Sequence, residues 1–159
     1  MNYLGIEPKK LTKVVKQLNV LLSNYSVYYQ NLRNFHWQIV GINFFEIHRL
    51  YEELYNDAKL KVDEIAERIR TLGNKPMGKM SEYLRLSDIK ETDNDLGDIK
   101  MAKTILDNHR YLIKLLRITI KEAGKAGDEG TIDLLGSHLS EMEKKSWMLN
   151  AWLVNSNKS

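Results

Sequence analysis

Two histidines and three acidic residues occur at helical spacing in the first half of the chain. His36 is followed by the pair His48 and Glu52, and then by the pair Asp63 and Glu67. A spacing of four places both members of a pair on one face of a helix. Imidazole nitrogen and carboxylate oxygen together suit a redox-active transition metal. The pattern therefore indicates an iron site made from these five side chains.

Helical geometry decides whether these side chains can meet within one chain. At about 100° per residue, the residues from His48 to Glu67 share an arc of about 100° on one helix. At about 1.5 Å of rise per residue, however, His48 and Asp63 lie about 22 Å apart, whereas a metal–ligand bond spans about 2 Å. One helix thus carries two half-sites, which an antiparallel copy about a two-fold axis would complete twice. We therefore expect a dimer with two equivalent sites.

The same residue types allow other interpretations. Histidine–glutamate and aspartate–glutamate pairs at this spacing also occur as ordinary exposed helix pairs, or as interface hydrogen bonds in a structural oligomer without metal. The sequence Glu-x-x-His occurs nowhere in the chain, which argues against a di-iron site inside a single helical bundle. His109 and His138 have no acid at a matching spacing, and we expect them to be satisfied or solvent-facing histidines.

Helix start and stop signals place the half-sites within an all-α chain. A first helix is expected from Pro8, with an apolar 3.6-residue pattern that Gly41 ends. A second begins at Asn43, where Glu46 would complete a capping box, and ends at residues 73–76.

The sequence of the second half of the chain predicts three further helices. A long polar connection joins the second long helix to the third. The three helices are a short helix near Met80–Leu86, a long helix over Ile99–Ala123 closed by Gly124 and Gly127, and a long helix from its cap at Asp128 to about Val154. Four long helices with one long crossover predict a four-helix bundle with a short extra helix between the second and third.

Composition limits the class of protein. The 159 residues, 43% of them hydrophobic, fit a single domain, 1–159, with short tails at about 1–7 and 155–159. The absence of cysteine excludes disulfides and thiolate metal sites and suits a reducing compartment. No segment approaches the roughly 18 apolar residues of a membrane span, and the first residues lack a secretory signal pattern. We expect a cytoplasmic protein.

Several motifs together resemble the Dps family of mini-ferritins. They are Asn34–His48 with its His-Trp pair and Gly turn, Glu52–Tyr55, the Asp63–Ile69 run that contains Ala66-Glu67-Arg68, and Trp147–Leu153. The resemblance implies a ferritin-like bundle that assembles into a hollow dodecamer. Such a shell oxidises Fe(II) with hydrogen peroxide or oxygen, without haem, and stores ferric mineral, which protects against oxidative damage.

The resemblance also implies which subunit supplies each ligand. Residues matching His36, His48 and Glu52 come from one subunit at the two-fold interface, and those matching Asp63 and Glu67 come from its neighbour. Many family members carry Asp where this chain has Glu52, whose side chain is longer by one methylene. We expect Glu52 to bind the metal directly, as a bridge or through water.

The remaining predictions concern two further acidic residues and an alternative function in DNA binding. Asp128 suits a helix cap, but the resemblance implies that Asp128 and Asp133 line three-fold pores through which Fe(II) enters. The alternative function is non-specific DNA binding and compaction with a weak or vestigial metal site, in association with the nucleoid. A net charge of +3 gives this alternative only mild electrostatic support.

Overall fold

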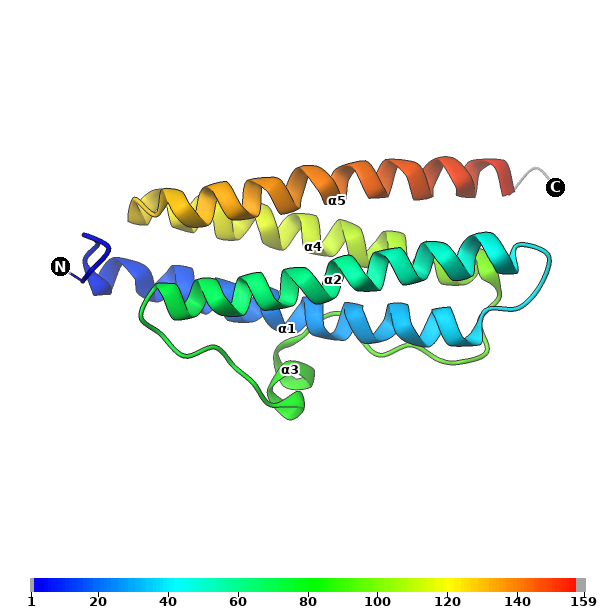
Figure 1. Ribbon diagram of the computed structural model, residues 1–159, viewed down its shortest axis with the longest axis horizontal. Coiled ribbons are helices and arrows are strands. Elements are labelled where there is room, and N and C mark those ends of the chain that lie inside the picture. The colour runs from blue at the N-terminus through cyan, green and yellow to red at the C-terminus, as the bar shows by residue number, and fades with distance from the viewer. Residues whose placement is uncertain (1, 157–159) are drawn as a thin grey trace.

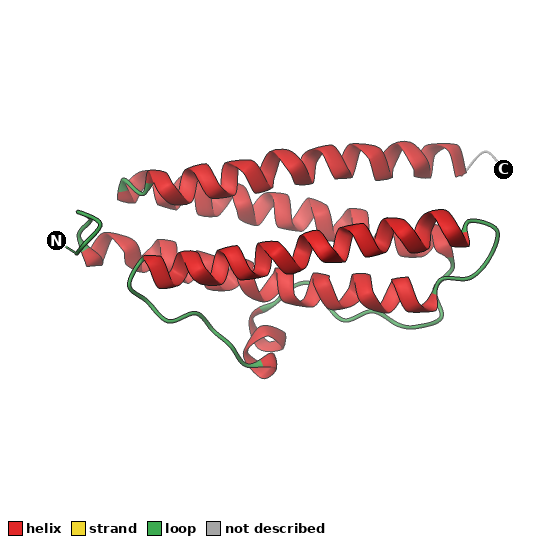
Figure 2. Ribbon diagram, viewed as in Figure 1, coloured by secondary structure: helices red, strands yellow, loops and turns green. Residues whose placement is uncertain are grey.

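The computed structural model describes residues 2–156, which form five helices and no strand (Figures 1 and 2). They are α1 (Pro8–Gln38), α2 (Phe44–Thr71), α3 (Met80–Leu86), α4 (Asp98–Ala126) and α5 (Glu129–Ser156). The predicted four-helix bundle with a short helix in the crossover is confirmed. Of the expected tails, residues 1 and 157–159 lie outside the described residues.

The bundle consists of two helical hairpins. Helix α1 packs against α2, and α4 packs against α5, while α1 also packs against α4 and α3 (Figure 1). Each hairpin turns a leucine- and isoleucine-rich face toward the other, and these faces make one continuous core. Among residues 2–156, no helix combines the length and apolar character that crossing a membrane requires.

The helix ends explain why two sequence expectations need correction. Helix α4 continues through Gly124 and ends only at Gly127, because that residue adopts the left-handed conformation, with φ of 70°, that glycine tolerates. Asn43 stands at the start of α2 but makes no capping hydrogen bond. Its amide instead donates to Asp98 Oδ2 over 2.7 Å, so it links the α1–α2 turn to the start of α4.

Buried asparagines on α1 hold the long crossover against the bundle. Asn24 is fully buried, and its side-chain oxygen accepts hydrogen bonds from Ser87 Oγ and from the backbone N–H groups of Asp88 and Ile89. Further along α1, Asn31 donates to a crossover carbonyl over 2.9 Å. These contacts satisfy backbone groups of a segment without regular structure, so that α4 begins at a fixed place beside α1.

Candidate metal centre

The two histidines lie together at the α1–α2 turn. His36 is near the end of α1, His48 is in the second turn of α2, and their rings stack with centroids 3.7 Å apart. Each ring also contacts the other residue's backbone: His36 Nδ1 lies 2.7 Å from the His48 carbonyl oxygen, and His48 Nδ1 lies 2.8 Å from the His36 carbonyl oxygen. We call this reciprocal arrangement the histidine clasp.

The histidine clasp fixes which ring nitrogens can bind metal. A carbonyl oxygen only accepts, so each Nδ1 must carry the hydrogen and donate it. In a neutral ring this leaves a lone pair on Nε2, the nitrogen that takes no part in the clasp. Backbone carbonyls that orient ligand imidazoles in this way are a common feature of metal sites. The stacked rings therefore present two oriented Nε2 donors.

The three carboxylates of the predicted set are exposed. Glu52 lies one turn after His48 on α2, whereas Asp63 and Glu67 lie in the second half of the same helix. Within the described chain, none of the three carboxylates has a hydrogen bond or an ion pair. Carboxylates without partners are free to bind a cation.

The structure does not bring all five residues together. Across residues 2–156, no group of three or more histidine and acidic side chains is arranged to hold a metal ion. His36, His48 and Glu52 lie at one end of α2, and Asp63 and Glu67 lie at the other. This separation agrees with the two half-sites expected from helical geometry.

Apolar side chains are exposed near both half-sites. Large side chains are exposed at the α1–α2 turn and along α2, and Ile42 is 98% exposed. They are Trp37, Val40, Ile42, Phe45 and Leu60. Asp63 borders a shallow hollow on this face of α2. Apolar patches of this kind mark surfaces that another protein covers.

Aromatic side chains surround the histidine clasp. Phe44 stacks on His48 with ring centroids 4.8 Å apart, and Tyr55 meets His36 edge to face at 5.3 Å. Trp37 is 56% exposed, which excludes a role in the core of the single chain, and the Arg33 guanidinium carbon lies 4.8 Å from its ring centroid. Tyr55 was not singled out by sequence, because a tyrosine at an apolar helical position signals only packing.

The two pore candidates differ in their surroundings. Asp128 is buried: it accepts a hydrogen bond from the Thr131 backbone N–H, which caps α5, and forms an ion pair with Arg68 at 2.5 Å. Gly130 leaves room for this pair, because a Cβ there would lie 2.7 Å from Arg68 Nη2. Asp133, one turn into α5, is exposed. The contacts of Asp128 within the chain therefore correspond to capping, and Asp133 remains the accessible candidate.

The other two histidines are buried. His109 accepts the Tyr28 hydroxyl hydrogen at Nε2 over 2.8 Å, because its Nδ1 donates to Ser146 Oγ, whose own hydrogen goes to the Met142 carbonyl. Desolvation by burial lowers the pKa of His109 to about 3. His138 lies 2.7 Å from Glu64 and has a lowered pKa, chiefly because of burial. Their partners come from other helices, so sequence spacing could not have found them.

Comparisons with known proteins give a consistent result. The family model described as a ferritin-like domain matches residues 15–159. A DNA protection during starvation protein from Porphyromonas gingivalis is 42% identical over 93% of each chain, and DNA protection during starvation protein 2 from Bacillus anthracis is 38% identical over 89% of this chain and 97% of its own. The crystal structure of the Vibrio cholerae DPS protein, described as a member of a broad superfamily of ferritin-like diiron-carboxylate proteins, superposes with a TM-score of 0.94, 42% identity and 96% coverage of both chains.

Proposed function

The chain belongs to the Dps family of ferritin-like proteins, and on this premise we propose that it is a ferroxidase whose iron site is shared between two subunits of a hollow dodecamer. His36, His48 and Glu52 of one subunit would face Asp63 and Glu67 of the next. The observation that carries this proposal is the histidine clasp, which leaves two Nε2 lone pairs for a metal at the end of α2 that also carries the unpartnered Glu52.

The donor set suits iron oxidation. Iron is the substrate here: two Fe(II) ions give two electrons to one hydrogen peroxide, which with two protons becomes two waters, and Fe(III) passes to the mineral inside the shell. The imidazoles bind Fe(II), and three carboxylates favour the higher charge of Fe(III). Phe44 and Tyr55 cover the rings and limit the access of water to them. Oxygen is the other candidate oxidant.

The test compares two pairs of acids on the same helix. Asp63→Asn with Glu67→Gln removes the second half-site, whereas Glu46→Gln with Glu53→Gln removes two exposed acids from another face of α2. With added Fe(II) and peroxide, we expect the first variant to lose oxidation above the uncatalysed rate and the second to keep it. Anaerobic Co(II) titration should show the same contrast in binding. Equal activity of the two variants would refute the proposed site.

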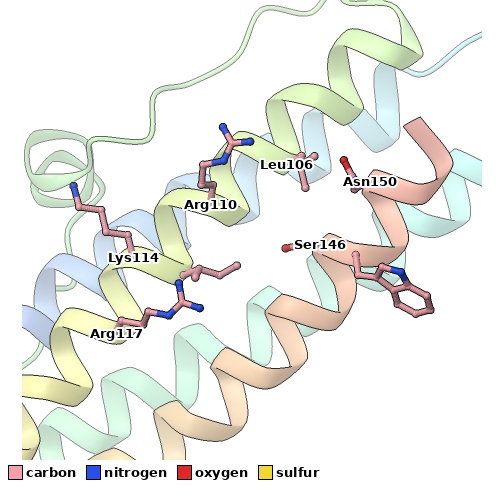
Figure 3. A pocket seen from close by; sticks show the side chains of 8 residues that line it. Leu106, Arg110, Lys114, Arg117, Ser146 and Asn150 are labelled. Carbon is pink, nitrogen blue, oxygen red and sulfur yellow. The ribbon is translucent and has the colours of Figure 1, made fainter. Parts of the chain in front are cut away.

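DNA binding is a second candidate function, and one surface favours it. Arg110, Lys114 and Arg117 recur at helical spacing on the exposed face of α4, beside a groove of about 560 Å³ between α4 and α5. Figure 3 shows that Arg110 and Lys114 extend outward from α4. Cations on a folded helix can neutralise phosphates without a flexible basic tail. The names of the two relatives above agree with a role in protecting DNA.

The DNA hypothesis has its own test. The variant Arg110→Gln with Lys114→Gln should weaken binding to duplex DNA and reduce its dependence on salt, since fewer counterions are released. Lys75→Gln with Lys79→Gln removes two exposed cations that lie outside α4, and this variant serves as the control. If both variants bind DNA like the unchanged protein, α4 is not the DNA surface.

A further inference from the structure

A chain of hydrogen bonds crosses the interior of the bundle and takes no part in the proposed iron site. The Tyr28 hydroxyl on α1 donates to His109 Nε2 on α4 over 2.8 Å, and His109 Nδ1 donates to Ser146 Oγ on α5 over 3.0 Å. Ser146 in turn donates to the Met142 carbonyl oxygen over 2.7 Å. These contacts join three helices, and we call them the tyrosine–histidine chain.

The first hydrogen bond of this chain pairs a phenol with a base away from water. Tyr28 is 2% exposed and His109 is fully buried. Burial raises the pKa of the Tyr28 hydroxyl well above its usual range and lowers the pKa of His109 to about 3, so both groups are uncharged at neutral pH. The His109 ring carries its hydrogen on Nδ1, so the lone pair on Nε2 faces the phenol hydrogen.

The other fully buried tyrosines lack such a base. Tyr25 and Tyr51 are fully buried, and within residues 2–156 neither hydroxyl has a hydrogen-bond partner. A phenol that loses an electron becomes a strong acid, and without a base in reach its positive charge would stay in apolar surroundings, which is costly. Proton transfer requires an acceptor at hydrogen-bond distance. Of these three tyrosines, only Tyr28 meets that requirement.

Aromatic rings lead from Tyr28 toward the histidine clasp. His36 lies eight residues after Tyr28 on α1, which is about 12 Å along the helix axis. Tyr55 meets His36 with ring centroids 5.3 Å apart, and Tyr29 meets Tyr55 at 6.2 Å. Tyr29 is the neighbour of Tyr28 in the sequence. An electron can therefore pass between Tyr28 and the clasp in short steps from ring to ring.

We propose that Tyr28 is a redox-active residue, which gives one electron to a one-electron oxidant and passes its hydroxyl proton to His109 Nε2. The O–H bond of Tyr28 breaks and an N–H bond forms at Nε2. The products are a neutral tyrosyl radical, an imidazolium and the oxidant reduced by one electron. The imidazolium donates from both nitrogens, to the radical oxygen and to Ser146 Oγ.

The surroundings of His109 make this reaction reversible. The tyrosine–histidine chain ends at the Met142 carbonyl, which has no hydrogen to pass on, so the proton stays on His109. Because burial disfavours the imidazolium, the proton returns to Tyr28 as soon as the radical regains an electron. The site can therefore react again without taking up a proton from solvent.

A peroxide-derived radical is the class of oxidant that the protein would meet. A single Fe(II) gives hydrogen peroxide one electron, which yields hydroxide and a hydroxyl radical. One electron from Tyr28, passed through the rings at the clasp, converts that radical to a second hydroxide. This use rests on the proposed function, whereas the redox reaction of Tyr28 itself does not.

The test supplies an oxidant that needs no iron. A ruthenium tris-bipyridine complex, excited by light in the presence of persulfate, gives Ru(III), which takes one electron at a time. The protein is then mixed with ascorbate and frozen, and its tyrosyl radicals are measured by EPR. Ascorbate removes radicals from exposed tyrosines, but Tyr28 is buried. We expect a radical that survives ascorbate in the unchanged protein and is lost in Tyr28→Phe.

Two further variants separate this reaction from a change in packing. Tyr25→Phe removes a buried hydroxyl one turn earlier on α1 that has no partner, and should keep the surviving radical. His109→Gln keeps a polar side chain but removes the base, and should abolish that radical. A surviving radical in Tyr28→Phe or in His109→Gln would overturn the proposal, and so would equal loss in Tyr25→Phe and Tyr28→Phe.

One measurement on the unchanged protein covers a variant that folds poorly. In protein produced in deuterated water, electron–nuclear double resonance should detect one deuteron hydrogen-bonded to the radical oxygen, because His109 holds it there. A surviving radical without this deuteron would contradict the proposal, as would the absence of any surviving radical. No iron is added, so these outcomes are independent of whether Asp63 and Glu67 support iron oxidation.

Discussion

A mixture of two inactive variants should recover activity if the iron site is shared. One variant carries His48→Gln and Glu52→Gln, and the other carries Asp63→Asn and Glu67→Gln. Each homodimer lacks one half of both sites and should not oxidise Fe(II). In a mixed dimer, the intact histidine half of one chain meets the intact acidic half of the other at one site, and both damaged halves meet at the second.

The size of the recovery follows from counting. If the chains pair at random from equal amounts, half of the dimers are mixed and each has one intact site of two, so about one quarter of all sites are intact. The separation of about 22 Å along α2 prevents one chain from supplying both halves of a site, since ligand bonds are about 2 Å long. The expected initial rate is therefore about one quarter of the rate of the unchanged protein.

The assay needs particles that contain both variants. Two differently tagged variants are co-expressed, mixed particles are isolated by both tags, and the ratio of chains is measured by mass spectrometry. Fe(II) oxidation is then followed under limiting peroxide. Particles that contain both chains but oxidise iron no faster than either variant alone would refute the shared site. Full activity in one homomeric variant would refute the assignment of that half.

Four further predictions concern stability. Asp128→Ala removes the cap of α5 and the ion-pair partner of Arg68, and should lower the free energy of unfolding by about 2–4 kcal/mol in urea titrations. The pKa of His109 is about 3 in the folded protein, whereas an unfolded histidine has a pKa of about 6.5. The neutral His109 therefore stabilises the fold fully above about pH 6.5. As the pH falls from about 6.5 toward 3, this stabilisation is lost by about 1 kcal/mol per pH unit. His109→Gln should flatten the decline in urea midpoint between pH 6.5 and 4.5, and an unchanged slope would contradict the assignment. Asn24→Ala frees the crossover and should expose it to limited proteolysis, with the rest of the chain cut no faster. Tyr51→Phe removes a buried hydroxyl without a partner, so calorimetry should show equal or higher stability. A free energy of unfolding lower by about 1 kcal/mol or more would contradict this prediction.

The fold was predictable because its signals are local. Pro8 begins α1, and residues 80–86 form the short helix as the sequence indicates. The errors also have local causes. Gly124 lies in the interior of α4, where glycine weakens a helix without ending it, and the left-handed Gly127 supplies the actual end. Asn43 contacts Asp98, which lies 55 residues later, and no local capping rule contains that information.

The candidate site was predictable only as residue types and spacing. The periodicity of α2 places His48 with Glu52 and Asp63 with Glu67 at opposite ends of one helix, as the structure has them. That the two pairs form half-sites of one metal centre stays a prediction. The histidine clasp could not be predicted from the sequence. It depends on how the turn between α1 and α2 places a backbone carbonyl beside each ring. The tyrosine–histidine chain was missed for a related reason, because only the packing of α4 against α1 brings His109 to Tyr28.

If the iron site is divided between two chains, iron oxidation depends on the association of those chains. A free chain has two imidazoles and one carboxylate at one end of α2 and two carboxylates at the other, and neither set surrounds an ion. Iron oxidation would then begin only when two chains meet, so that Fe(III) forms where a shell exists to hold it. Activity per chain should accordingly fall on dilution in step with the dimer population, whereas a site within one chain would be indifferent to concentration.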